Sequence, residues 1–169
     1  MTEIKLPPKK IKDNRIVIRP TPNADSRTSN SLLSEETCRE DTYEHIRDVQ
    51  QAMNFFSAQV ARAGLMHDNT KVTEMDDYIK LVLDNVNSDD FLRSDWWIKH
   101  ITKERHHLND NCPVDVTLID VLEMIADGVM RKGRKGYFIS DELKLIDSGL
   151  LERAYWNTVK LLDDKVIVK

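Results

Sequence analysis

A helical repeat of apolar residues is the feature that most limits the fold of this chain. After Ser34, apolar side chains recur at three- and four-residue steps, at Ile46, Val49, Met53, Phe56 and Val60. This spacing places them along one face of an α-helix. Ser34 or Thr37 is a typical N-cap residue, and Gly64 marks the expected end of the helix. The pattern therefore predicts a long amphipathic helix over about residues 34–64.

Helical periodicity continues toward the C-terminus. It predicts helices over about residues 73–86, 88–107, 114–132, 140–149 and 150–164, with turns between them. Thr73 and Asp76 are the expected capping pair of the first of these helices. The helix over 114–132 should turn its apolar residues inward, namely Leu118, Val121, Leu122, Ile125 and Val129. We find no internal repeat and no convincing sheet, so the predicted fold is all-α, a bundle of about six helices.

The first 33 residues have a different composition. The phrases "LPPKK" and "RPTPNADSRTSNS" are incompatible with a helix, because proline lacks an amide donor and restricts the residue before it. The phrase "RIVI", residues 15–18, suits a short strand or a packed arm. We therefore divide the chain into an irregular N-terminal arm, residues 1–33, and a helical domain, residues 34–169. The arm is expected to be ordered only where it docks on the body or on a neighbouring subunit, which leaves a homo-oligomer open.

Charge and cysteine content limit the function classes. The net charge is −4, which argues against general binding to nucleic acid, although residues 1–20 carry +4 and the remainder therefore −8. Cys38 and Cys112 fit no metal or redox motif and suit a reducing cytoplasm. No stretch is long and apolar enough to span a bilayer, and the N-terminus lacks the apolar centre of a signal peptide. We therefore expect a cytoplasmic protein.

Histidines and carboxylates gather in one part of the sequence. All five histidines fall between residues 45 and 107, at His45, His67, His100, His106 and His107. Asp68 directly follows one of them, and Asp120, Glu123 and Asp127 lie on one side of the helix predicted over 114–132. Imidazole and carboxylate donors together suit Mn, Fe, Co, Ni or Zn, and carboxylates also suit Mg. The pattern predicts a divalent metal site.

The order His … His-Asp … Asp in an all-α chain resembles the HD-domain metal-dependent phosphohydrolases. The resemblance covers about Thr37 to Arg134. It implies that one divalent ion is bound by His45, His67, Asp68 and Asp127. The phrase "HH…DVLEMIADGVM" is similar to small HD-like proteins of phage and bacterial genomes. The gap from His45 to His67 is shorter than in nucleotidase-like branches, and no GYP phrase follows His106-His107, which disfavours a cyclic-di-GMP phosphodiesterase.

The resemblance also implies roles for further residues. The phrase "HDNTK" is similar to the HD-x-x-K form of the family, whose lysine often meets a substrate phosphate, which implies this role for Lys71. The spacing H-x5-HH is similar to multi-histidine HD branches and implies a second ion at His100 and His107, or alternatively a polar helix end. Substrate contacts are expected from His100, His106, Arg131 and Arg134, and catalytic roles from Lys71, Glu123 and Asp68.

Several of these residues have two interpretations. Glu123 is either a general acid/base or an anchor for a ligating histidine. Asp120 is an exposed charge, a cap partner or an acid of the site. Trp96 and Trp97 are expected to be packing residues rather than base-stacking platforms. Arg131 and Arg134 either capture phosphate or belong to a solvated loop.

These observations lead to one preferred function and one alternative. We expect a divalent-metal-dependent phosphohydrolase that acts on a nucleotide, preferably a deoxynucleoside mono- or triphosphate, or on a similar small phosphate compound, in a bacterial cell or phage-infected host. The preference for nucleotides comes from the resemblance alone. The alternative is a non-catalytic HD-like binding module whose metal is structural or absent.

Overall fold

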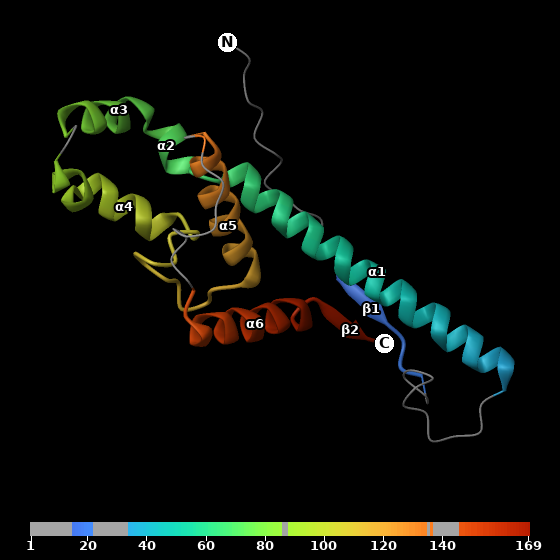
Figure 1. Cartoon of the computed structure of the whole chain (residues 1–169). Coiled ribbons are helices and arrows are strands. Elements are labelled where there is room, and N and C mark those ends of the chain that lie inside the picture. The colour runs from blue at the N-terminus through green and yellow to red at the C-terminus, as the bar shows by residue number, and fades with distance from the viewer. Residues whose placement is uncertain (1–14, 22–33, 86–87, 135, 137–145) are drawn as a thin grey trace, which may run out of the picture. The chain divides into compact units, whose positions relative to one another are not determined.

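The computed structural model describes residues 15–21, 34–85, 88–134, 136 and 146–169 (Figure 1). The chain divides into two compact units, residues 1–57 with 161–169, and residues 58–160. The described residues are mostly helical, which confirms the all-α fold class. None of the helices in the described part of the chain has the length and apolar content that a membrane span requires.

The first unit contains the beginning of helix α1 (Glu35–Met66) and a pair of short strands, β1 (Ile16–Ile18) and β2 (Val166–Val168). Ser34 begins α1 as expected, because its Oγ accepts a hydrogen bond of 3.1 Å from the amide of Thr37. The two strands pair in parallel, with Ile16 opposite Val166. The strand at 16–18 agrees with the "RIVI" prediction. The prediction that the chain contains no convincing sheet was wrong, because β1 and β2 form a two-stranded sheet. A three-residue strand such as β2 is too short to carry an alternating pattern.

The apolar stripe of α1 is open to solvent over much of its length. Ile46, Val49, Met53 and Val60 are all exposed in this structure. The periodicity correctly marked one face of the helix, but a hydrophobic face is buried only where another element packs against it.

The second unit contains the end of α1 and most of the remaining helices. These are α2 (Asn69–Thr73), α3 (Met75–Asp84), the 3₁₀ helix η1 (Asp89–Arg93), α4 (Asp95–Lys103), α5 (Leu118–Gly133) and α6 (Ser148–Asp163), of which residues 161–163 belong to the first unit.

Two predicted helix boundaries were wrong. Thr73 does not cap α3, because its hydroxyl donates to the carbonyl of Asn69 within α2, and α3 begins without a side-chain cap. The segment 88–107 is divided at Ser94, whose Oγ accepts from the amide of Trp97 and so begins a new helix, α4.

The predicted end of a helix at Gly149 was also wrong. This glycine lies in the first turn of α6, which begins at Ser148. Most of the short helix predicted over 140–149 lies outside the described residues.

The core of the second unit lies between α5, α6 and the loop that precedes α5. Its buried apolar side chains come from Leu108, Val116, Val121, Leu150 and Ala154, with Leu118 and Met124 packed against them. Leu122 and Ile125, which we expected to face inward, are instead exposed. These two side chains are exposed because α6 and the loop before α5 pack against only one side of α5.

Asp120 fixes the beginning of α5. Its Oδ2 accepts hydrogen bonds from the amide and hydroxyl of Thr117, and its two oxygens accept from Arg105 at 2.7 and 2.9 Å. Asp120 is therefore a cap partner, one of the interpretations allowed by the sequence. Arg105 also donates to Asp115, so the turn after α4 is tied to the loop before α5 as well as to Asp120 in α5.

Candidate metal centre

The candidate site forms around Asp68, between α1 and α2. Asp68 has φ 54° and ψ 30°, and among the described residues it is the one non-glycine residue with positive φ. Its carbonyl accepts from the amides of Lys71 and Val72, which fixes this turn. A left-handed conformation costs a non-glycine residue on the order of 1 kcal/mol or more, and such strain is common at functional sites. The strained backbone of Asp68 makes this residue a candidate functional residue.

Three imidazole rings turn their Nε2 atoms toward the Asp68 carboxylate. His67 Nε2 lies 3.6 Å from Oδ2, His100 Nε2 lies 3.4 Å from Oδ1, and His106 Nε2 lies 3.7 Å from Oδ1. The rings come from three places, the end of α1, helix α4 and the turn that follows α4. His100 is completely buried and His106 nearly so.

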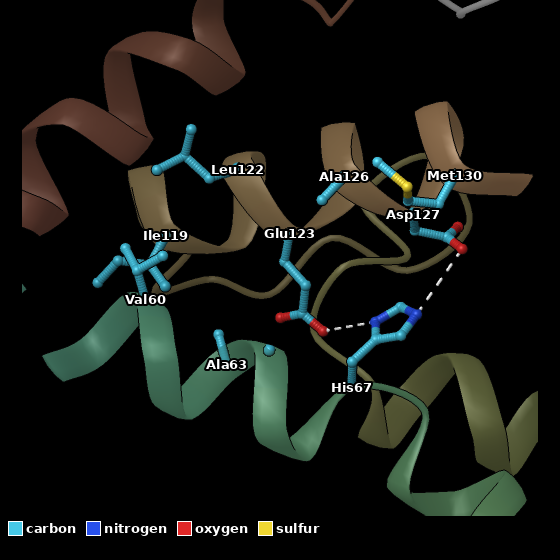
Figure 2. A pocket seen from close by; sticks show the side chains of 10 residues that line it. Val60, Ala63, His67, Ile119, Leu122, Glu123, Ala126, Asp127 and Met130 are labelled. Carbon is cyan, nitrogen blue, oxygen red and sulfur yellow. Dashed lines mark hydrogen bonds and ion pairs between the residues drawn. The ribbon is translucent and has the colours of Figure 1, made fainter. Parts of the chain in front are cut away.

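The opposite ring nitrogen of each histidine faces an oxygen. Glu123 Oε1 lies 3.0 Å from Nδ1 of His67 and 3.0 Å from Nδ1 of His106, and Figure 2 shows the first of these contacts. Thr70 Oγ1 lies 2.5 Å from Nδ1 of His100. A histidine whose Nδ1–H faces an oxygen keeps the lone pair of Nε2 for a metal ion. The hydrogen bonds at Nδ1 of His67 and His100 are compatible with this tautomer, whereas Nδ1 of His106 is buried and forms no hydrogen bond in the structure.

The spacing of the donor atoms fits a divalent ion. Ligands that bind one ion at 2.0–2.2 Å lie about 3.0–3.6 Å from one another, close to the separations around Asp68. Asp68 Oδ1 is buried and has no hydrogen-bond donor in the structure. Such a buried polar atom requires an explanation, and a cation supplies one. The donor set of imidazole nitrogen and carboxylate oxygen is also the appropriate one.

Two overlapping groups of donors are present among the described residues. The first is His67, Asp68 and His106, and the second is Asp68, His100 and His107. Within each group the ligand atoms lie within 4.8 Å of one another. His107 Nε2 lies 2.9 Å from His100 Nε2, so these two nitrogens face the same point. Asp68 is the carboxylate that the groups share.

Electrostatics favour the protonation states that metal ligands need at Asp68, His100 and His107. Burial acts to raise the pKa of Asp68, but the hydrogen bond from Lys71 Nζ at 2.6 Å and the charge of that ammonium outweigh it and lower the pKa. Burial lowers the pKa of His100 to about 4, and burial together with His106 lowers that of His107. Asp68 is therefore charged, and His100 neutral, at neutral pH.

His106 and Glu123 shift each other's pKa toward the charged form. Burial acts to lower the pKa of His106, but the nearby carboxylates, Glu123 first, outweigh it and raise the pKa. Burial acts to raise the pKa of Glu123, but its contacts with His106 and His67 lower it. Glu123 is thus held as a carboxylate between two rings, which is the arrangement of an anchor rather than of a general acid.

Three of the four residues expected to bind the first ion come together. His67 and Asp68 are adjacent, and Asp127 Oδ1 lies 3.7 Å from His67 Nε2 (Figure 2). His45 is exposed on α1 in the other unit and belongs to neither donor group. Its assignment as a ligand stays a prediction.

The residues expected to contact substrate lie in different places, and one of them, His100, is completely buried. His106 and Arg131, together with His107 and Asp127, line a cavity of about 350 Å³ whose wall also contains apolar side chains. Arg134 is exposed at the end of α5 and does not line this cavity. Lys71 points toward the site, because its ammonium contacts the Asp68 carboxylate.

Trp96 and Trp97 pack against the histidines. The ring of Trp96 stacks on His100 at a centroid distance of 5.2 Å, and Trp97 contacts both His100 and His107 at 5.3 and 5.2 Å. Their expected role as packing residues is consistent with this position, which restricts the orientation of two candidate ligands.

Sequence reasoning missed two residues around His100. Thr70 orients His100, and Glu104 Oε1 accepts a 2.7 Å hydrogen bond from the amide of Thr70. No local pattern distinguishes such a hydroxyl or carboxylate from an ordinary polar residue. His106, which was expected to contact substrate, belongs to the first donor group, and its predicted substrate contact stays a prediction. The adjacent pair His106-His107 was the available signal, since it places two imidazoles on one turn.

The comparisons with known proteins give one result. The model of DUF5662, a family of unknown function, matches residues 34–145, a range that contains every residue of the site described above. No curated protein and no solved structure matches the chain.

Proposed function

This chain belongs to the DUF5662 family, and we propose that it is a divalent-metal-dependent phosphohydrolase. The observation that carries the proposal is the convergence of three Nε2 atoms on the Asp68 carboxylate, one oxygen of which is buried without a hydrogen bond. A structural salt bridge does not need three imidazoles around one carboxylate.

The ion would be held by His67, Asp68 and His106, with Asp127 beside them. His100 and His107 would hold a second ion that shares Asp68. A divalent ion bound in this way makes water more acidic and neutralises charge on a phosphoryl group. Glu123 and Thr70 would keep the rings in position, since partners of this kind typically change metal affinity or activity 10–100-fold.

Lys71 and Arg131 would contact the phosphate. The Lys71 ammonium contacts the Asp68 carboxylate of the proposed centre. The Lys71 side chain is a quarter exposed, so it is accessible to a substrate. A point charge of this kind stabilises negative charge that develops on phosphoryl oxygens in the transition state. Arg131 lines the 350 Å³ cavity together with His106 and Asp127. A guanidinium there provides a second cation for a phosphate.

The substrate is a small phosphate compound. The resemblance to HD-domain enzymes supports a nucleotide, preferably a deoxynucleoside mono- or triphosphate, and a cytoplasmic setting in a bacterial cell or phage-infected host. This support is analogy at the level of the family.

The proposal is tested by metal analysis and a hydrolysis screen on the same purified protein. Elemental analysis should find at least one transition ion per chain. With Mn, Co, Ni, Zn or Mg added, nucleotides and simple phosphate esters should release phosphate or pyrophosphate, and a chelator should stop the release. A protein that binds no added ion and hydrolyses no member of the panel would exclude the proposal.

The exposed apolar stripe of α1 favours a second candidate, an HD-like binding module. Ile46, Val49 and Met53 offer a surface for a protein partner, because exposed apolar side chains in a row are typical of interaction sites. Such a module would be indifferent to the chelator. Partner binding that persists without metal, in a protein that lacks turnover, would favour this function.

A further inference from the structure

A second cavity lies between the last turns of α1 and helix α5. Its volume is about 290 Å³. Val60 and Ala63 line it from α1, and Leu122, Ala126 and Met130 line it from α5 (Figure 2). The surface that these residues present is almost entirely apolar. The cavity therefore suits a small apolar group rather than a charged one.

This cavity ends at the candidate metal centre. His67, Glu123 and Asp127 form its polar wall, and Figure 2 shows the imidazole between the two carboxylates. The same His67 ring has its Nε2 3.6 Å from Asp68. A ligand in the apolar cavity therefore lies against a ring that also belongs to the first donor group.

Asp127 lies in the wall of both cavities. It lines the apolar cavity and also the 350 Å³ cavity that Arg131, His106 and His107 line. A molecule that crosses this position would meet an apolar wall at one end and imidazole and guanidinium groups at the other. A phosphate ester has this polarity, with an organic group at one end and a phosphate at the other.

We propose that the apolar cavity binds the organic group of the substrate, and that the substrate is a phosphate ester with an alkyl or small aryl group. The inference rests on the proposed phosphohydrolase function and, within its class of small phosphate compounds, favours an alkyl or aryl ester over a nucleotide. Hydrolysis would add water across the P–O bond and release the alcohol and inorganic phosphate. The apolar lining offers few atoms for hydrogen bonds to a nucleobase edge, so affinity would come from burial of apolar surface.

Gly64 provides a way to fill the cavity. It lines the cavity from α1, and a Cβ atom added to it would meet no atom within 4 Å. Gly64→Leu should therefore place its side chain in the open space, while the helix gains a better helix former. Gly133→Leu is the matched control, because Gly133 is also helical, has the same open space at its Cβ and does not line the cavity.

The experiment uses two series of probes on the metal-loaded full chain. Phosphate release is measured from n-alkyl phosphates from methyl to hexyl. Binding of the corresponding n-alkyl phosphonates, which are not hydrolysed, is measured by calorimetry. In the wild type, kcat/KM and affinity should each rise by up to about fourfold per buried methylene. Gly64→Leu should flatten both dependences, and Gly133→Leu should keep them.

The outcomes separate this inference from the proposed function. Equal values for methyl and hexyl compounds, with phosphate released from both, would overturn the apolar site and leave the phosphohydrolase standing. Binding that depends on chain length without phosphate release from any ester would support the apolar site and overturn the phosphohydrolase. A wild-type dimer that Gly64→Leu dissociates in sedimentation would overturn the substrate assignment, because a second copy would then occupy the cavity.

Discussion

Asp68 and Asp120 are two aspartates of the same unit with opposite surroundings. Asp120 is saturated with donors, since Arg105 and Thr117 supply hydrogen bonds to both of its oxygens. Asp68 receives one ammonium contact on Oδ2, while Oδ1 is buried beside imidazole nitrogens and has no hydrogen bond. A carboxylate that serves the fold satisfies its oxygens within the chain. A carboxylate that serves a ligand keeps one of them for that ligand.

The largest expected effect comes from removing the Asp68 carboxylate. Asp68→Gly should abolish metal binding and lower turnover by about 10³-fold or more, because the carboxylate shared by both donor groups is lost. The fold should be retained, since glycine accepts the left-handed backbone of this position without strain. Metal content, steady-state kinetics and circular dichroism on one preparation measure all three. Turnover at the wild-type level would show that Asp68 is not a ligand.

Lys71 should affect chemistry and not metal content. Lys71→Met should lower kcat/KM by on the order of 10²-fold, the scale for one electrostatic contact in a transition state, and leave the ion bound. Lys71→Arg should restore activity only in part, because a planar guanidinium has a different reach. Metal titration and kinetics of the two variants distinguish these effects. Unchanged kinetics in Lys71→Met would make this lysine only a counter-charge for Asp68.

Glu123 should act through the rings it holds. Glu123→Gln keeps the size of the side chain but removes the negative charge beside His67 and His106. Metal affinity should fall about 10–100-fold. Glu152→Gln on the exposed surface of α6 is the control and should leave affinity unchanged. If metal-saturated Glu123→Gln has wild-type affinity but no turnover, Glu123 is a general acid/base instead.

Asp120 should affect stability and not the ion. Asp120→Ala removes a helix cap and charged hydrogen bonds, and should lower the free energy of unfolding by about 1–3 kcal/mol. Asp115→Ala, which removes the exposed second partner of Arg105, should cost less than about 1 kcal/mol. Urea denaturation gives both values, and metal content per folded chain should not change. Loss of the ion in Asp120→Ala at full folding would contradict the division between the two aspartates.

Local sequence patterns were sufficient where neighbouring residues decide the structure. The apolar period and the Ser34 cap predicted the beginning of α1, because a helix is formed by contacts between residues three and four apart. Most of the residues of the candidate site were also found from sequence, since imidazoles and carboxylates are the side chains that bind such ions. The apolar stripe of α1, by contrast, gave no information about which element covers it.

Asp120 and Glu123 show what only the tertiary structure decided. They lie three residues apart on one side of α5, and the sequence left a role in the site open for both. Asp120 accepts hydrogen bonds from Arg105 and from the N-terminus of α5. Glu123 instead contacts two histidines that lie outside α5. Both outcomes depend on contacts between residues 15 to 56 positions apart, which no helical period encodes. The sequence by itself determined the helices and the types of donor, and packing determined which carboxylate keeps an oxygen for a ligand.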